Sequence, residues 1–196
     1  MKTRTRKEYY PNGRIKLSEE GYGDTDNFVR HGKSIYWSEK RALSLKEECC
    51  HGKLHGERIE YHDNETPEII EHYEDGKLND KRSEYDINGQ LTLEEEYKDD
   101  ELNGKRREWD SDVNITKVEE YKHGKKHGTC TSYAGGEKFL VEEYFEGVKE
   151  GFTTLWLNNE KICGVFFQGG EEIEERIEIY NQKRYDLIIK LLTKIK

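Results

Sequence analysis

Hydrophobic and polar positions alternate along most of this chain, in short stretches separated by turn-forming residues. Four of these stretches read P-E-I-I-E-H-Y, L-T-L-E-E-E-Y, I-T-K-V-E-E-Y and F-L-V-E-E-Y, and each ends at a tyrosine. A period of two, with Ile, Leu, Val and Thr at alternate positions, predicts half-buried β-strands. Neither face of these strands is wholly apolar, which favours a sheet with limited cover over a sandwich core.

The alternating stretches belong to a repeat of 23–24 residues. One series of aromatic residues ends the first strand of each unit, at Tyr61, Tyr85, Trp109, Tyr133 and Trp156. A second series ends the following strand, at Tyr73, Tyr97, Tyr121 and Tyr144. Two series with one period indicate a repeat architecture.

The segments between the two series predict turns. Clusters of Asn, Asp, Gly and Ser follow each residue of the first series, as in tight hairpins. After the second series, two Gly, Asn or Asp positions lie four residues apart, which predicts a wider turn with residues at positive φ. The glycines expected to hold these turns are Gly104, Gly124, Gly128, Gly147 and Gly151.

The two ends of the chain depart from the repeat. Residues 1–36 read as an irregular first unit with an insertion near 23–27. Residues 171–196 place apolar side chains at helical spacing, which predicts an amphipathic helix of up to about 25 residues. We therefore predict a repeat array over 1–170 and a helix over 171–196 that covers a sheet edge. The expected fold is an all-β, elongated, single-layer antiparallel meander of about six hairpin units with a capping helix.

Composition and charge narrow the function classes. Hydrophobic residues make up 32% and charged residues 38% of the 196, and the net charge is −9. An acidic protein is repelled by nucleic acid and by anionic lipid, whereas a basic protein partner is favoured. The acidic and basic strands alternate, so cross-strand pairs neutralise part of the charge, at the low end of about 0.2–1 kcal/mol per pair if exposed.

The four cysteines fit neither a disulfide framework nor paired C-x-x-C zinc spacing. Together with the lack of a signal-peptide pattern, this predicts a cytoplasmic location.

Histidines and carboxylates are the candidate chemical groups. The i, i+4 pairs His51/His55 and His123/His127 would share a helix face, but they lie in turns between predicted strands. Turn residues are the better account, and we expect no metal. The adjacent Cys49 occupies a packing position of the second series, and no pair of carboxylates stands out as acid and base. We therefore expect no catalytic residues, no cofactor and no enzyme activity.

The segment from Tyr121 to Gly128, Y-K-H-G-K-K-H-G, followed by Tyr133, resembles the MORN-repeat variant with its aromatic-x-x-G-K-x-x-G core. Residues 97–109 and 144–156 match similarly, and the resemblance covers roughly 5–170. Asp80, Cys49 and Val148 depart from the pattern. The resemblance implies an antiparallel β-meander without enzyme activity. Bacterial members are described as antitoxins or immunity proteins, and eukaryotic relatives as scaffolds.

These observations favour a protein-interaction module, most concretely an antitoxin or immunity protein that binds a basic toxin. The alternative is a scaffold, cytosolic or at a membrane surface, with the C-terminal helix on lipid. The residues expected to contact the partner are Glu94, Glu95, Glu96, Asp99, Asp100, Glu101, Trp109, Glu119 and Glu120.

Overall fold

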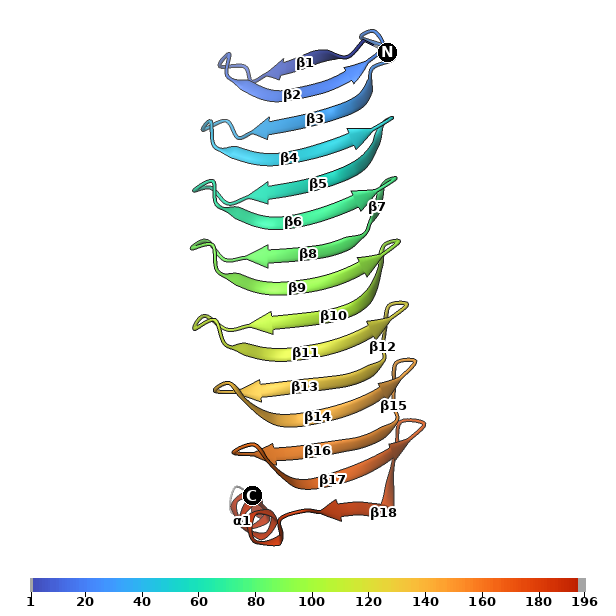
Figure 1. Cartoon of the computed structure of the whole chain (residues 1–196). Coiled ribbons are helices and arrows are strands. Elements are labelled where there is room, and N and C mark those ends of the chain that lie inside the picture. Colours follow the sequence, from blue (N-terminus) through green and yellow to red (C-terminus); the bar gives the residue numbers. More distant parts are fainter. Residues whose placement is uncertain (1, 194–196) are drawn as a thin grey trace. The chain divides into compact units, whose positions relative to one another are not determined.

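A computed structural model gives the structure of residues 2–193, with the side chains at 174–177, 188 and 191–193 outside the description. The chain divides into two compact units, Met1–Glu101 and Leu102–Lys196. In each unit successive long strands pair antiparallel (Figure 1), two-residue strands pair with the long strand before them, and a helix ends the second unit. The predicted antiparallel β-meander with a C-terminal helix is confirmed.

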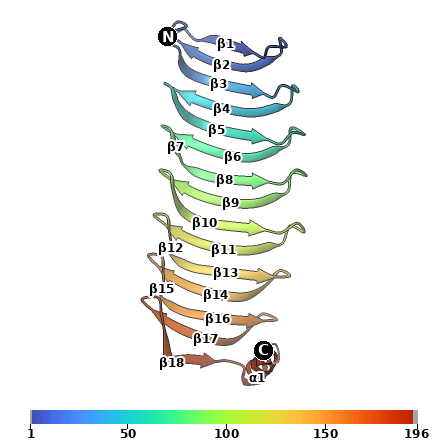
Figure 2. The same ribbon diagram turned by 180° about the vertical axis from the view of Figure 1, so that it is seen from behind.

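The first unit is entirely β-structure, and Figure 2 shows its strands from behind as one layer. Its strands are β1 (Arg4–Tyr9), β2 (Ile15–Tyr22), β3 (Val29–Trp37), β4 (Leu43–Cys50), β5 (Lys53–Tyr61), β6 (Pro67–Glu74), β7 (Lys77–Leu78), β8 (Asp80–Tyr85) and β9 (Leu91–Lys98).

The second unit continues the meander and ends in the helix. It contains β10 (Glu101–Trp109) from its second residue on, and then β11 (Ile115–Lys122), β12 (Lys125–Lys126), β13 (Gly128–Ala134), β14 (Glu137–Phe145), β15 (Val148–Lys149), β16 (Gly151–Leu157), β17 (Glu160–Gln168), β18 (Glu171–Ile179) and α1 (Gln182–Thr193).

The turn predicted to be wide is in fact a two-residue hairpin followed by a bulge. Glu74 pairs with Lys77 across Asp75 and Gly76, both at positive φ, as a type I′ turn requires. Leu78 pairs with Tyr73 and Ser83 with Ile70, so the four residues 79–82, Asp80 among them, lie opposite only two residues of β6. The second glycine-like position therefore lies in the bulge, because the chain must shift register before the next strand.

The C-terminal prediction is wrong for residues 171–179, which form strand β18 instead of helix. Gly169 and Gly170, both at positive φ, make a two-residue turn that returns the chain against β17. The open ladder of β17 outweighs the helical spacing of the isoleucines, a tertiary effect that local pattern does not contain. The boundary predicted at 170/171 thus cuts through a hairpin.

The helix itself is shorter than expected. Asn181 caps it, since its Oδ1 accepts a hydrogen bond from the Arg184 backbone N–H at 3.2 Å. Arg184 donates to the Leu157 carbonyl at 2.9 Å and pairs with Glu160, which fixes α1 beside the β16–β17 turn. The predicted contribution of residues 194–196 lies outside the described residues.

Among the described residues, few apolar side chains are buried, and more polar ones are. The buried apolar residues are Leu17, Cys49, Cys130 and Ile162. The buried polar residues are Glu19, Ser34, Glu47, Glu71, Glu95, Glu119, Thr131 and Thr154. The glutamates lie on one side of the sheet within each unit, which we call the glutamate face.

Candidate functional site

The glutamate face of the first unit is a ladder of buried carboxylates and arginines. Arg82 pairs with Glu71 and with Glu95, each at 3.2 Å, and so joins two neighbouring second-series strands. Arg58 pairs with the same Glu71 at 2.7 Å. Tyr73 donates its hydroxyl to Glu71 at 3.1 Å. Each buried carboxylate thereby gains charged and neutral donors, as a buried charge requires.

The sequence signal for this ladder is an E-x-Y triplet that recurs every 23–24 residues and an R-x-E triplet that recurs every 24. Both triplets can be read from the sequence, but the runs of glutamate around them do not show which glutamate faces inward. The E-x-Y triplets begin at Glu71, Glu95, Glu119 and Glu142, and the R-x-E triplets begin at Arg58, Arg82 and Arg106.

At β3 and β4, other residues replace a tyrosine and an arginine that the later repeats supply to the ladder. Where Cys49 replaces the tyrosine, Tyr36 from β3 donates to Glu47 at 3.2 Å. Arg30 pairs with Glu47. It replaces the arginine found at the centre of β5 and β8, because the equivalent position in β3 is Ser34. Cys49 packs in the place of the tyrosine and is buried. Burial raises the pKa of its thiol.

In the second unit lysines take over from arginine. Glu119 pairs with Lys117 at 2.9 Å and with Lys126 at 2.8 Å, besides Arg106. Glu142 pairs with Lys149 at 2.6 Å. Burial by itself raises the pKa of Glu119, but the two ammonium groups outweigh burial and lower that pKa to about 2.

The structure removes two residues from the predicted partner surface. Glu95 and Glu119 are buried and engaged by cations of the chain, with exposed fractions of 7% and 2%. The prediction that they face a partner is wrong, because strand alternation turns them inward while their neighbours turn outward. Glu94 lies on the opposite side and pairs with Lys81 at 3.0 Å.

Other predicted partner residues lie at the two-residue-turn edge or on the outward side. Asp99 pairs with Lys77 at 3.2 Å, and Asp100 Oδ1 accepts a hydrogen bond from the Leu78 N–H at 2.8 Å. Glu101 is exposed, whereas Glu96 is half-buried.

Glu120 has a structural role that explains the bulge glycine. Its Oε2 accepts a hydrogen bond from the Thr129 N–H at 3.1 Å. A Cβ added at Gly128 would lie 2.2 Å from this oxygen, and Gly128 has φ +87°. The positive φ favours glycine at this bulge, and any larger residue would also displace the Glu120 carboxylate. In the first unit Asp80 occupies the equivalent position with His72 in place of the glutamate.

Trp109 lies at the other edge, where it lines a shallow pocket of about 380 Å³ with Ile115 and Tyr133. A similar pocket of about 350 Å³ in the first unit is lined by Ile15 and Trp37. In both pockets the apolar residue that begins a second strand, Ile115 or Ile15, lies beside an aromatic residue of the next hairpin. They are hollows between successive hairpins.

The edge formed by the two-residue turns differs in charge between the two units. In the first unit this edge holds the exposed acidic residues Glu74, Asp75, Asp99 and Glu101, which we call the acidic turn edge, with the exposed Lys77 and Lys98 beside them. In the second unit the turn of β11 and β12 reads K-H-G-K from Lys122, and the turn of β14 and β15 holds the exposed Glu146. Residues 1–101 contain 17 Lys and Arg against 25 Asp and Glu, a net charge of −8, while residues 102–196 contain 16 against 17.

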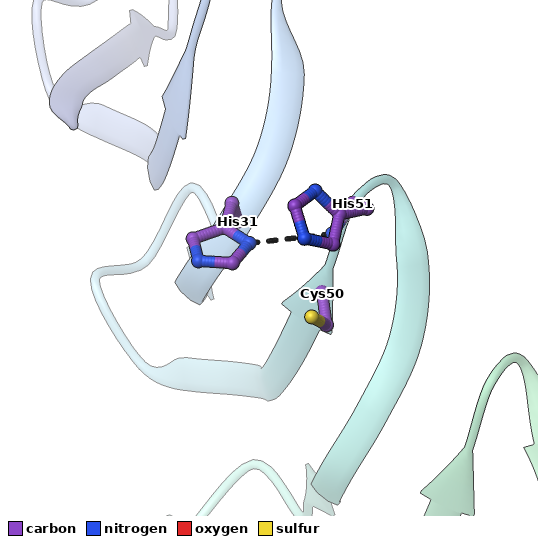
Figure 3. Close-up of side chains that lie close together, drawn as sticks. All are labelled: His31, Cys50 and His51. Atoms are coloured by element: carbon purple, nitrogen blue, oxygen red, sulfur yellow. Dashed lines mark hydrogen bonds between the residues drawn. The ribbon is translucent and has the colours of Figure 1, made fainter. Parts of the chain in front are cut away.

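The histidines gather differently from the predicted i, i+4 pairs. His51 lies with His31 and Cys50, and one donor atom of each residue is within 4.8 Å of the others (Figure 3). His55 instead lies 3.7 Å from Asp75. Sequence spacing missed this cluster because His31 comes from β3, twenty residues before the turn that holds His51.

No protein-family model and no curated protein matches this chain. Within the described part of the chain, no helix has the length and apolar character needed to cross a bilayer.

Proposed function

We propose that the chain is a non-enzymatic protein-interaction module that binds a basic partner through the acidic turn edge of its first unit. In the most concrete form it is a cytoplasmic bacterial antitoxin or immunity protein that neutralises a cognate toxin by direct binding. The resemblance to the MORN-repeat variant supports this class of function.

The observation that carries the proposal is the uneven placement of uncompensated charge. In the first unit, the buried Glu19, Glu47, Glu71 and Glu95 are matched by Arg6, Arg30, Arg58 and Arg82. The net charge of −8 therefore belongs to the remaining residues of this unit, most of them at the surface. Such a surface steers a basic protein toward it and accelerates association at low ionic strength.

The turn edge is suited to contact because its side chains project from a rigid ladder. Asp75 and Asp99 lie in successive two-residue turns, with exposed fractions of 80% and 58%. Each occupies a left-handed position that the hairpin fixes. A partner would meet a row of carboxylates that needs little ordering on binding.

The test is co-expression with each protein encoded by a neighbouring gene, followed by binding measurements at low and high salt. Glu74→Lys with Glu101→Lys reverses charge at strand positions of the acidic turn edge. We expect at least tenfold weaker binding, mainly through a slower association rate. The matched control is Lys122→Glu with Lys125→Glu in the second unit, which should leave binding unchanged or improve it. Equal losses from both pairs, or binding independent of salt, would contradict the proposal.

A second candidate function is a membrane-peripheral scaffold, and the exposure of α1 favours it. Leu187 and Ile189 are 56% and 42% exposed, and Lys183 and Lys190 belong to the same helix. Because β18 pairs with β17, truncation at 171 would damage the sheet, and Leu187→Glu is the better variant. Flotation with anionic liposomes should be lost in this variant if α1 contacts lipid. Equal flotation of both proteins removes this candidate.

A further inference from the structure

The most unusual side-chain cluster in the first unit joins two strands and a turn. His31 comes from β3, Cys50 ends β4, and His51 lies in the β4–β5 turn (Figure 3). One donor atom from each lies within 4.8 Å of the other two. Tyr22 and Thr3 join both histidines in lining a pocket of about 220 Å³. The cluster is therefore reachable from solvent.

The repeat explains the two histidines in part. His31 Nδ1 accepts a hydrogen bond from the His51 N–H at 3.3 Å, and Asn79 does the same for the Asp99 N–H at 3.1 Å. His51 has φ +50°, as do its counterparts in other two-residue turns, and histidine tolerates this region better than most residues. Both positions could thus be filled by residues without metal-binding chemistry.

Cys50 has no such explanation. The equivalent positions in later repeats are Glu74, Lys98, Lys122 and Phe145, which are exposed side chains. Cys50 is half-buried and unoxidised, and it directs its sulfur to the space beside the two rings (Figure 3). Only at this turn do sulfur and two imidazoles occupy the three positions together.

We propose that His31, Cys50 and His51 bind a zinc-class divalent cation. Thiolate and imidazole are the ligands that Zn²⁺ prefers, at about 2.3 Å and 2.0–2.1 Å. Tetrahedral ligands at these lengths lie roughly 3.3–3.8 Å apart, so the three groups need to close by about 1 Å. Side-chain rotation suffices, because the backbone already places the donors around one point.

A hydrogen-bond partner that can orient one of the ligands is already present. Tyr22 Oη lies 2.8 Å from His51 Nδ1. In the tautomer with hydrogen on Nδ1, His51 donates to Tyr22 and leaves Nε2 for the cation, the arrangement that usually orients ligating histidines. His31 contributes Nδ1, so its long hydrogen bond from the His51 N–H gives way to the metal bond.

Binding must release one proton. The Cys50 thiol gives up its hydrogen to solvent as the sulfur–metal bond forms, and no redox change occurs. Three protein ligands leave a fourth position, which water fills. The three ligands are not residues of the acidic turn edge, so this proposal does not depend on the proposed function.

The test is titration of the purified, reduced chain with Zn²⁺ alone, followed by Co²⁺ as a spectroscopic probe. We expect one equivalent of Zn²⁺ per chain and a thiolate-to-Co²⁺ charge-transfer band. Cys50→Ser and His51→Asn should each weaken binding more than about 100-fold, and Tyr22→Phe by about tenfold. Asn keeps the left-handed turn position, so His51→Asn is expected to fold normally.

The matched controls are His123→Asn, at the same turn position three repeats later in the sequence, and Cys163→Ser. Both should bind Zn²⁺ as tightly as the unaltered chain. The proposal fails if the unaltered chain binds no more Zn²⁺ than Cys50→Ser, or if Co²⁺ gives no thiolate band. Equal weakening by His123→Asn also overturns it, since that would mean dispersed binding to surface histidines.

Discussion

The two units bury the same repeated glutamate but supply its positive charge from different places. In the first unit, Arg58 and Arg82 come from the centre of the first-series strand and each contacts two buried carboxylates. In the second unit the corresponding positions after Arg106 are Cys130, which is buried, and Thr153, which is half-buried. Lys126 and Lys149, from the short strands after the turn, take over the pairing.

The difference follows from the shapes of the two cations. A guanidinium is planar with five donors, so one arginine can join two carboxylates across neighbouring strands. An ammonium is compact, and its long stem can reach the carboxylate from a turn while packing along an aromatic ring. Lys126 lies 5.1 Å from the Tyr144 ring, and Lys149 lies 5.0 Å from that of Phe167. The first unit is thus cross-linked strand to strand, and the second is held from its turn edge.

The largest expected effect is the loss of stability when one arginine of the ladder is removed. Arg82→Met should reduce the free energy of unfolding by about 3–5 kcal/mol, because Glu71 and Glu95 each lose a cation while remaining buried. The matched change in the second unit is Cys130→Ala, which removes one buried sulfur and should cost about 1 kcal/mol. Urea unfolding of both variants measures the difference.

A rescue variant sharpens the same comparison. Leu78 is the first-unit counterpart of Lys126. Adding Leu78→Lys to Arg82→Met therefore supplies a lysine to the buried carboxylate from the short strand after the turn, as in the second unit. We expect it to recover at least half of the lost stability. No recovery would show that the two ladders are not interchangeable.

The next largest effect concerns pH. The folded pKa of Glu119 is about 2, below its usual 4.5, so its pairing stabilises the fold fully above pH 4.5. This stability, about 2 kcal/mol after allowance for solvent around the lysines, is lost as pH falls from 4.5 to 2. Glu119→Gln should therefore be less stable than the unaltered chain at pH 6 and equal to it near pH 2. A constant difference across this range would argue against ion pairing as the cause.

A smaller effect is expected at the bulge. Gly128→Ala places a Cβ 2.2 Å from Glu120 Oε2 at φ +87° and should cost about 2 kcal/mol. Gly124→Ala, at φ +72° with nothing within 4 Å, should cost about 1 kcal/mol. Because the first unit combines Asp80 with His72, Glu120→His should reduce the cost of Gly128→Ala. Thermal unfolding of Gly128→Ala, Gly124→Ala, Glu120→His and the double variant Glu120→His with Gly128→Ala tests this. Equal costs at both glycines would refute the role of Glu120.

The smallest effect is on the tyrosine hydroxyls. Tyr73→Phe removes the donor to Glu71 at 3.1 Å and should cost about 1 kcal/mol, since two arginines remain on that carboxylate. In the second unit Phe167 already occupies this position, since it pairs with Gly151 as Tyr73 pairs with Gly56, and Val165 replaces the glutamate. Phe167→Tyr should therefore bring no gain. A stabilising Phe167→Tyr would show that the hydroxyl acts without the carboxylate.

Local pattern was sufficient for the repeat, the strands and the tight turns, because period-two alternation and turn residues act over a few positions. It failed at β18, where Gly169 and Gly170 join residues 171–179 to β17. It also failed for Glu95 and Glu119, since a run of glutamates does not reveal which member has an arginine opposite it. The pattern also did not predict the His31–Cys50–His51 cluster, because it does not show which residues of neighbouring strands lie side by side.

The sequence by itself thus determined the period, the aromatic series and the net charge of this protein. Only the tertiary structure decided which glutamates are buried, which cations neutralise them and which distant side chains meet at a turn. The physical reason is that strand periodicity depends on neighbours in the chain, whereas burial and charge pairing depend on register between strands. Register brings Arg82 opposite Glu95 and His31 beside His51, and no local pattern contains it.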